Sequence, residues 1–211
     1  MQVFVRKHIS FIAWTLALAV TMAGFVAWAQ HHSWQLIGIS NYQLFPLFGI
    51  LAFSLMWCHY MIGGIKAGFN IQDAKVDKRY FEVTAGIVLL ALFIHPSLLI
   101  WQLFRDGFGL PPGSYTNHYV APGLAWAVLL GSVSWLAFMS FELRRFYGNK
   151  KWWKYVLYAN DVAIWLVYIH SLLLGADVAA PWLHQVWIFY GLALAAAFGA
   201  TYYKKFAKSA P

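Results

Sequence analysis

The chain alternates between long apolar stretches and short polar ones. Six stretches reach the length of about 20 residues that a helix needs to cross the core of a bilayer. They cover residues 11–30, 42–64, 80–104, 119–141, 153–174 and 182–203. Each is apolar throughout rather than along one 3.6-residue stripe, which is typical of helices surrounded by lipid and by one another. The pattern predicts an all-α membrane protein, a single domain over residues 1–211 with six transmembrane helices.

The first apolar stretch also resembles a secretory signal peptide. Arg6, Lys7 and His8 form a basic start, and Ala27-Trp28-Ala29 is similar to a cleavage site. However, the apolar run between them is longer than the usual core of a signal peptide. We therefore expect this stretch to be retained as the first helix.

Composition agrees with a membrane protein. Hydrophobic residues make up 62% of the 211 residues and charged residues only 10%, whereas soluble domains carry about 25% charged residues. The 12 Trp and 12 Tyr suit the boundaries between water and lipid. A single cysteine, Cys58, excludes an internal disulfide and a CxxC motif.

Basic residues separate by side once the six helices are placed. Of the 15 Lys and Arg, only Arg105 falls on the side opposite to the termini. Such a bias places both termini in the cytoplasm. We expect a multi-pass protein of the plasma or inner membrane whose basic face contacts anionic lipid, and the charge needs no nucleic acid to explain it. The other 14 are Arg6, Lys7, Lys66, Lys75, Lys78, Arg79, Arg144, Arg145, Lys150, Lys151, Lys154, Lys204, Lys205 and Lys208.

Two histidines, His95 and His170, lie deep inside apolar helices. They are about 22 Å and 25 Å from the cytoplasmic starts of the third and fifth helices, at 1.5 Å per residue. Ionisable groups inside a membrane are costly and usually functional. Two neutral imidazoles at one level suit the axial positions of one b-type haem. The alternative is that each histidine only hydrogen-bonds a neighbouring helix. Pro96 frees the carbonyl of Leu92 and permits a bend there.

The remaining histidines near the outer helix ends are interpreted differently. His31, His32, His118 and His184 are typical of interfacial positions. Because all four lie on the outer side, a metal site there is the alternative interpretation.

Three segments carry a resemblance to a known family. They are Gly49-Ile-Leu-Ala-Phe-Ser-Leu-Met, residues 85–99 around His95-Pro96, and Ile169-His170-Ser-Leu-Leu-Leu-Gly175. They resemble the ferric reductase-like transmembrane domain. That family includes the membrane domain of NADPH oxidases and the haem-binding membrane subunit of the periplasmic methionine sulfoxide reductase system. The resemblance implies six helices, cytoplasmic termini and haem-ligating histidines on the third and fifth helices.

The resemblance also implies one haem rather than two. Members with two haems carry a second histidine pair, expected here near Phe81 or Glu82 and near Val156 or Leu157, and none of these is histidine. The inner half instead has His59, Glu82 and Asp161 as its main polar candidates. Two interpretations stay open for these three residues: helix ends at the level of the headgroups, or a quinone or proton site.

Together these features predict a b-type haem membrane cytochrome. It would carry electrons within or across the membrane from a quinol or a separate flavoprotein to an acceptor on the outer side. It would thus act as the electron-transfer subunit of a transmembrane reductase, with the redox chemistry supplied by haem. The alternatives are a non-redox membrane anchor or assembly subunit with the same fold, and a haem-dependent sensor.

Overall fold

The computed structural model describes residues 1–141 and 143–207, and that part of the chain is helical without strands. Five helices are long and apolar enough to cross a membrane, whereas α4 has 17 residues. This agrees with an all-helical membrane protein. The five are α1 (Gln2–His31), α2 (Asn41–Gly68), α3 (Lys78–Arg105), α6 (Trp153–Leu174) and α7 (Pro181–Ala207), and α4 covers Ala125–Phe141. Shorter ones are η1 (Tyr115–Tyr119), α5 (Arg144–Tyr147) and η2 (Asp177–Ala179).

The fourth helix differs from the sequence prediction, because it begins at Ala125 and not at Tyr119. Val120 is extended, with φ −104° and ψ 150°, and Pro122 disfavours helical backbone at the next residue, Ala121. Gly123 then turns the chain with a φ of +88°. Hydropathy does not register this break, since Val120, Ala121 and Pro122 are apolar.

The first helix is longer than predicted, beginning at Gln2 rather than at residue 11. Its polar start is held by the connection between α2 and α3. Arg6 forms an ion pair with Asp73, and the backbone N–H of Asp77 donates to Ser10 Oγ at 2.9 Å. These contacts extend the helix beyond the apolar stretch.

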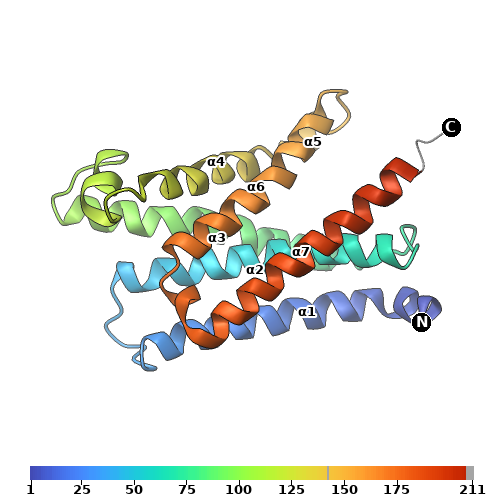
Figure 1. Cartoon of the computed structure of the whole chain (residues 1–211), viewed down its shortest axis with the longest axis horizontal. Helices are drawn as coiled ribbons and strands as arrows, with labels where there is room; N and C mark the ends of the chain where they lie inside the picture. Colours follow the sequence, from blue (N-terminus) through green and yellow to red (C-terminus); the bar gives the residue numbers. More distant parts are fainter. Residues whose placement is uncertain (142, 208–211) are drawn as a thin grey trace.

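The long helices lie roughly side by side, and both termini are at the same end of the bundle (Figure 1). Helix α2 is the centre: it packs against α1, α3 and α7 and is the most buried of the long helices. Helices α4 and α6 form a second closely packed pair. Ser134 on α4 contributes to that pair, since its Oγ donates to the Ala163 carbonyl at 3.0 Å.

The outward faces of the bundle are apolar. In water such a surface would be unusual for a monomer, whereas lipid tails solvate it without cost. This agrees with membrane-spanning helices. Exposed side chains on these faces include Phe11, Leu18, Met22, Ile87, Leu90, Phe93, Leu129, Leu136, Val162, Phe189 and Leu192.

Basic residues gather at the end of the bundle that holds the termini. The connections from α2 to α3 and from α4 to α6 lie at this end (Figure 1). Arg105, at the last position of α3, lies at the other end. Lys208 is outside the described residues. The separation of basic residues predicted from the sequence thus corresponds to the two ends of one helical bundle.

We predict that Gly64→Leu destabilises the bundle and that Gly86→Leu does not. A Cβ on Gly64 would lie 2.7 Å from Cα of Ala197 on α7, whereas a Cβ on Gly86 meets nothing within 4 Å. Forcing α2 and α7 apart should cost about 1–3 kcal/mol. Denaturant or thermal unfolding of the purified protein in detergent measures this. Equal stabilities of the two variants would contradict the close approach.

Candidate functional site

His95 projects from α3 against the backbone of α2. Its Nδ1 lies 2.8 Å from the Phe45 carbonyl, so Nδ1 carries the proton and donates it. The ring occupies the space beside Gly49, where an added Cβ would lie 2.8 Å from His95 Cε1. The backbone of α2 can meet the imidazole this closely only because residue 49 lacks a side chain.

His170 repeats the same arrangement in the other helix pair. It projects from α6 against α4, and its Nδ1 donates to the Ala127 carbonyl at 2.7 Å. An added Cβ on Gly131 would lie 2.7 Å from His170 Cε1 and Nδ1. In both pairs the accepting carbonyl is four residues before the glycine, one helical turn away.

The two histidines therefore have the same tautomer and lie equally far along their helices. With Nδ1–H donated, Nε2 of each ring keeps its lone pair. In the described part of the chain no hydrogen bond reaches either Nε2, and neither is a fully enclosed atom. Each histidine lies 17 residues after the first residue of its helix, Lys78 or Trp153.

The sequence predicted that Pro96 frees the Leu92 carbonyl, and in the structure this carbonyl accepts a hydrogen bond from another helix. Proline lacks an N–H, which leaves that carbonyl without its helical donor. The indole Nε1 of Trp135 on α4 donates to it at 2.9 Å. The ring of Trp135 also meets Phe93 edge-on, with centroids 5.8 Å apart. This hydrogen bond joins the two helix pairs one turn from His95.

An apolar cluster covers the site towards the connection between α3 and α4. Phe45, Leu99 and Leu103 are buried there, and Tyr115 and Tyr119 pack on them. Phe45 meets the His95 ring at 5.2 Å and Tyr119 at 5.9 Å. The cluster keeps water from the imidazoles on this side.

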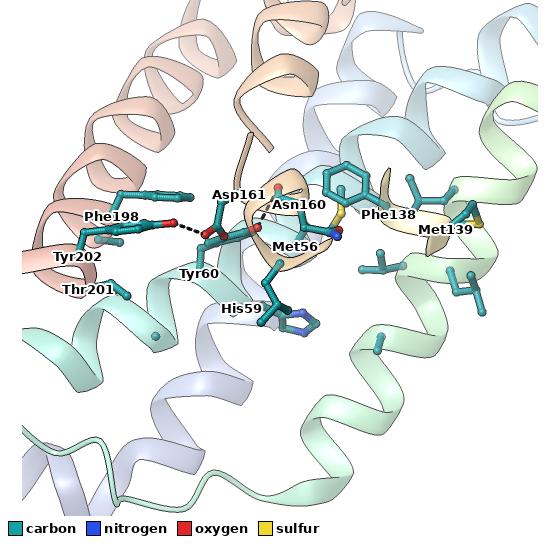
Figure 2. A pocket seen from close by; sticks show the side chains of 17 residues that line it. Met56, His59, Tyr60, Phe138, Met139, Asn160, Asp161, Phe198, Thr201 and Tyr202 are labelled. Carbon is teal, nitrogen blue, oxygen red and sulfur yellow. Dashed lines mark hydrogen bonds between the residues drawn. The ribbon is translucent and has the colours of Figure 1, made fainter. Parts of the chain in front are cut away.

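A second feature is a partly open cavity of about 360 Å³ in the half of the bundle nearer the termini (Figure 2). Its lining combines aromatic and methionine side chains with a few polar groups. Leu92 also lines it, three residues before His95, or about 4.5 Å along the helix. Labelled lining residues in Figure 2 are Met56, His59, Tyr60, Phe138, Met139, Asn160, Asp161, Phe198, Thr201 and Tyr202.

His59 enters this cavity with a defined tautomer. Thr84 lies one turn after Tyr80 in α3, and its hydroxyl donates to the Tyr80 carbonyl at 2.7 Å. Since its proton is used there, the hydroxyl accepts from His59 Nε2, also at 2.7 Å. His59 Nδ1 is left unprotonated and able to take a proton.

Asp161 is the other ionisable group in the cavity. Tyr202 on α7 donates to its Oδ2 at 2.6 Å, and the Tyr60 hydroxyl donates to the neighbouring Asn160 carbonyl at 3.2 Å. Figure 2 shows the Tyr202 bond at one side of the cavity and His59 at another. The arrangement offers two separate proton acceptors around an aromatic lining.

The structure brings together only part of the predicted inner site. His59 and Asp161 line one cavity, whereas Glu82 does not. The Glu82 carboxylate is exposed and pairs with Lys78 Nζ at 3.0 Å. Residues that the sequence interpretation did not single out are Gly131, Trp135, Tyr60 and Tyr202. Gly131 stands out in the sequence as a glycine within an apolar helix, but no nearby residue indicates that it packs against His170.

Comparison of the chain with family models, with curated proteins and with solved structures finds no match. The ferric reductase-like resemblance therefore stays a prediction. What the two sites do must be inferred from their own geometry and chemistry.

We predict that Trp135→Phe lowers stability more than Trp101→Phe. Loss of the Trp135 indole leaves the buried Leu92 carbonyl without a donor, at a cost of about 1–3 kcal/mol. Trp101 is exposed on α3 and serves as the matched control. Unfolding midpoints in the same detergent compare the two. A Trp101 effect as large as the Trp135 effect would contradict the assigned role.

Proposed function

We propose that the chain is a b-type haem membrane cytochrome in which His95 and His170 ligate one haem iron. The observation that carries this proposal is the repeated geometry of the imidazoles. Each Nδ1–H is held by a carbonyl, and each Nε2 keeps a lone pair. Histidines that bind metals usually donate their second N–H in this way, which fixes the tautomer and raises ligand basicity.

The surroundings fit a planar group between α3 and α6. Among the described residues, these helices do not form a closely packed pair, while each packs against its own partner. Gly49 and Gly131 let the rings approach closely to the backbones of α2 and α4. When bound, haem supplies a one-electron redox centre. The chain supplies two neutral ligands, an apolar cover and the Trp135 bond that joins the helix pairs.

We further propose six membrane-spanning helices with both termini in the cytoplasm. The basic end of the bundle supports this orientation by the positive-inside rule. Helix α4 rises about 25 Å, and η1 with its following turn completes the crossing. His95 and His170 then lie in the outer half, as the ferric reductase-like resemblance implies for one haem. The electron acceptor would approach from the outer side of a plasma or inner membrane.

A quinol in the inner cavity is the donor that the side chains favour. Met56, Phe138 and Phe198 suit a flat apolar ring, and His59 and Asp161 suit its two hydroxyls. The cavity reaches Leu92, which brings a bound ring to within about one helical turn of His95. A donor that stays at the cytoplasmic surface, such as a flavoprotein, would be about 20 Å away.

Oxidation of one quinol to quinone releases two electrons and two protons. A haem held by His95 and His170 would supply the one-electron acceptor for this oxidation. One proton passes to His59 Nδ1, which the Thr84 hydroxyl leaves free by accepting from Nε2. The other passes to the Asp161 carboxylate, oriented by Tyr202. General-base groups positioned in this way typically contribute 100-fold or more to such steps.

Two alternatives lead to different observations. A non-redox anchor or assembly subunit would use the same fold without haem, and a haem-dependent sensor would bind haem without oxidising quinol. The repeated histidine geometry favours haem, and the cavity beside it favours electron transfer.

We predict one haem per chain, lost in His95→Ala and in His170→Ala, because one axial ligand rarely holds a b-type haem between helices. A pyridine haemochrome assay and a reduced-minus-oxidised spectrum of the purified protein measure content and ligation. His184→Ala, at an exposed position of α7, is the control and should keep the full spectrum. Wild-type protein without haem bands would favour the anchor alternative.

A glycine variant separates ligation from folding in the same assay. Gly131→Ala keeps both histidines but displaces the His170 ring, so haem content should fall, whereas Gly86→Ala should not change it. Full low-spin spectra in both histidine variants would refute the pair. Two haems per chain would make His59 the leading inner ligand.

We predict that a reduced quinol analogue reduces the haem in the isolated protein faster than a flavoprotein with NADPH does. Asp161→Asn and His59→Gln should slow quinol oxidation about 10-fold or more at unchanged haem content, since each removes a proton acceptor. Glu82→Gln is the control, because Glu82 lies outside the cavity. Stopped-flow absorbance follows the reduction. The reverse order of the two donors would refute the quinol route.

A further inference from the structure

Three metal-ligating side chains meet at the end of the bundle opposite to the termini. His31 and His32 lie where α1 ends, and Asp177 begins η2 in the connection between α6 and α7. They are 146 and 145 positions apart in the chain, yet one ligand atom from each falls within 4.8 Å of the others. The atoms are His31 Nδ1, His32 Nε2 and a carboxylate oxygen of Asp177.

The Asp177 carboxylate is buried, with 2% of the residue exposed. A buried carboxylate is stable only where hydrogen bonds or positive charge offset its lost hydration. In the described part of the chain its side-chain partners are the two histidines. His31 Nδ1 forms a hydrogen-bonded contact with Oδ1, and His32 Nε2 lies 3.9 Å from the same oxygen. Among the described residues, no Lys or Arg forms an ion pair with this carboxylate.

His32 supplies an independent sign of a ligand site. Its Nε2 is enclosed and has no hydrogen-bond partner in the described part of the chain. The ring is held by stacking on His31 at 5.1 Å and by the edge of Trp28 at 5.3 Å. A separation of 3.9 Å is too long for a hydrogen bond. Two ligands of one tetrahedral zinc ion are about 3.3 Å apart, so a small shift would bring both atoms to a metal.

The surroundings favour a cation and hold the elements in place. Helix α1 ends at His31, and the carbonyls at a helix C-terminus carry negative partial charge. Trp182 Nε1 at the start of α7 donates to Gln30 Oε1 on α1 at 2.9 Å. The two elements that supply the ligands are therefore tied together beside the site.

We infer that His31, His32 and Asp177 form a binding site for a divalent transition-metal ion of the Zn²⁺ type. Two imidazole nitrogens and one carboxylate are typical zinc ligands and leave a fourth position for water or another ligand. Mg²⁺ and Ca²⁺ prefer oxygen ligands and should bind poorly. The metal would link the end of α1 to the α6–α7 connection. This inference does not depend on haem at His95 and His170.

The test uses the full chain in detergent after treatment with a chelator. Titration with Zn²⁺ should show one saturable site by calorimetry and a higher melting temperature, because a ligand that binds only the folded state stabilises it. Mg²⁺ should do neither. Saturable binding of Mg²⁺ with equal affinity, or no saturable binding of Zn²⁺, would overturn the inference.

Variants locate the ion. His32→Ala and Asp177→Asn should each weaken Zn²⁺ binding about 100-fold or more, since even groups behind the ligands contribute 10–100-fold. His118→Ala, another histidine at the same end of the bundle, is the matched control and should bind as the wild type does. Unchanged affinity in His32→Ala and Asp177→Asn would overturn the assignment.

A measurement on the wild-type protein guards against variants that fail to fold. X-ray absorption at the zinc edge should show a shell of nitrogen and oxygen ligands with the outer-shell scattering of two imidazoles. A shell of oxygen atoms alone, or the scattering of one imidazole, would also overturn the site.

Discussion

The contact between an imidazole and a glycine backbone is the constraint on which the interior depends. A histidine inside a lipid-facing bundle must place its N–H on an acceptor, and helical carbonyls are available only where the neighbouring backbone comes close. Gly49 and Gly131 provide that approach, so Phe45 and Ala127 offer their carbonyls to His95 and His170. The same contact sets the spacing within each helix pair and the direction in which each Nε2 points.

The two helix pairs are joined by polar bonds rather than by close backbone packing. Trp135 reaches the carbonyl that Pro96 releases, and Tyr168 donates to the Trp187 carbonyl at 3.1 Å on the other side of α6. Among the described residues, α6 does not pack closely against α3 or α7, and the inner cavity is lined by all three helices. The small residues at the contact of Gly64 with Ala197 have the opposite effect and bring α2 and α7 together.

The halves of the bundle differ in chemistry because their polar groups differ. The half nearer the termini combines His59 and Asp161 around an apolar cavity, which suits a ligand that releases protons. The half farther from the termini holds the His95 and His170 imidazoles, whose Nε2 lone pairs suit a metal. At that end of the bundle, His31, His32 and Asp177 repeat that chemistry in a more polar setting.

The sequence by itself determined the helical membrane class, the approximate spans and the gathering of basic residues at one end, because hydropathy and charge act locally. It also made His95 and His170 candidates, since an ionisable group in an apolar helix is conspicuous, and it predicted the Leu92 carbonyl that Pro96 frees. Only the tertiary structure decided which backbone each imidazole meets, that Asp161 shares a cavity with His59 while Glu82 pairs with Lys78, and that Asp177 reaches His31. Those facts depend on side chains from helices far apart in the chain, and apolarity alone carries no information about which helices become neighbours.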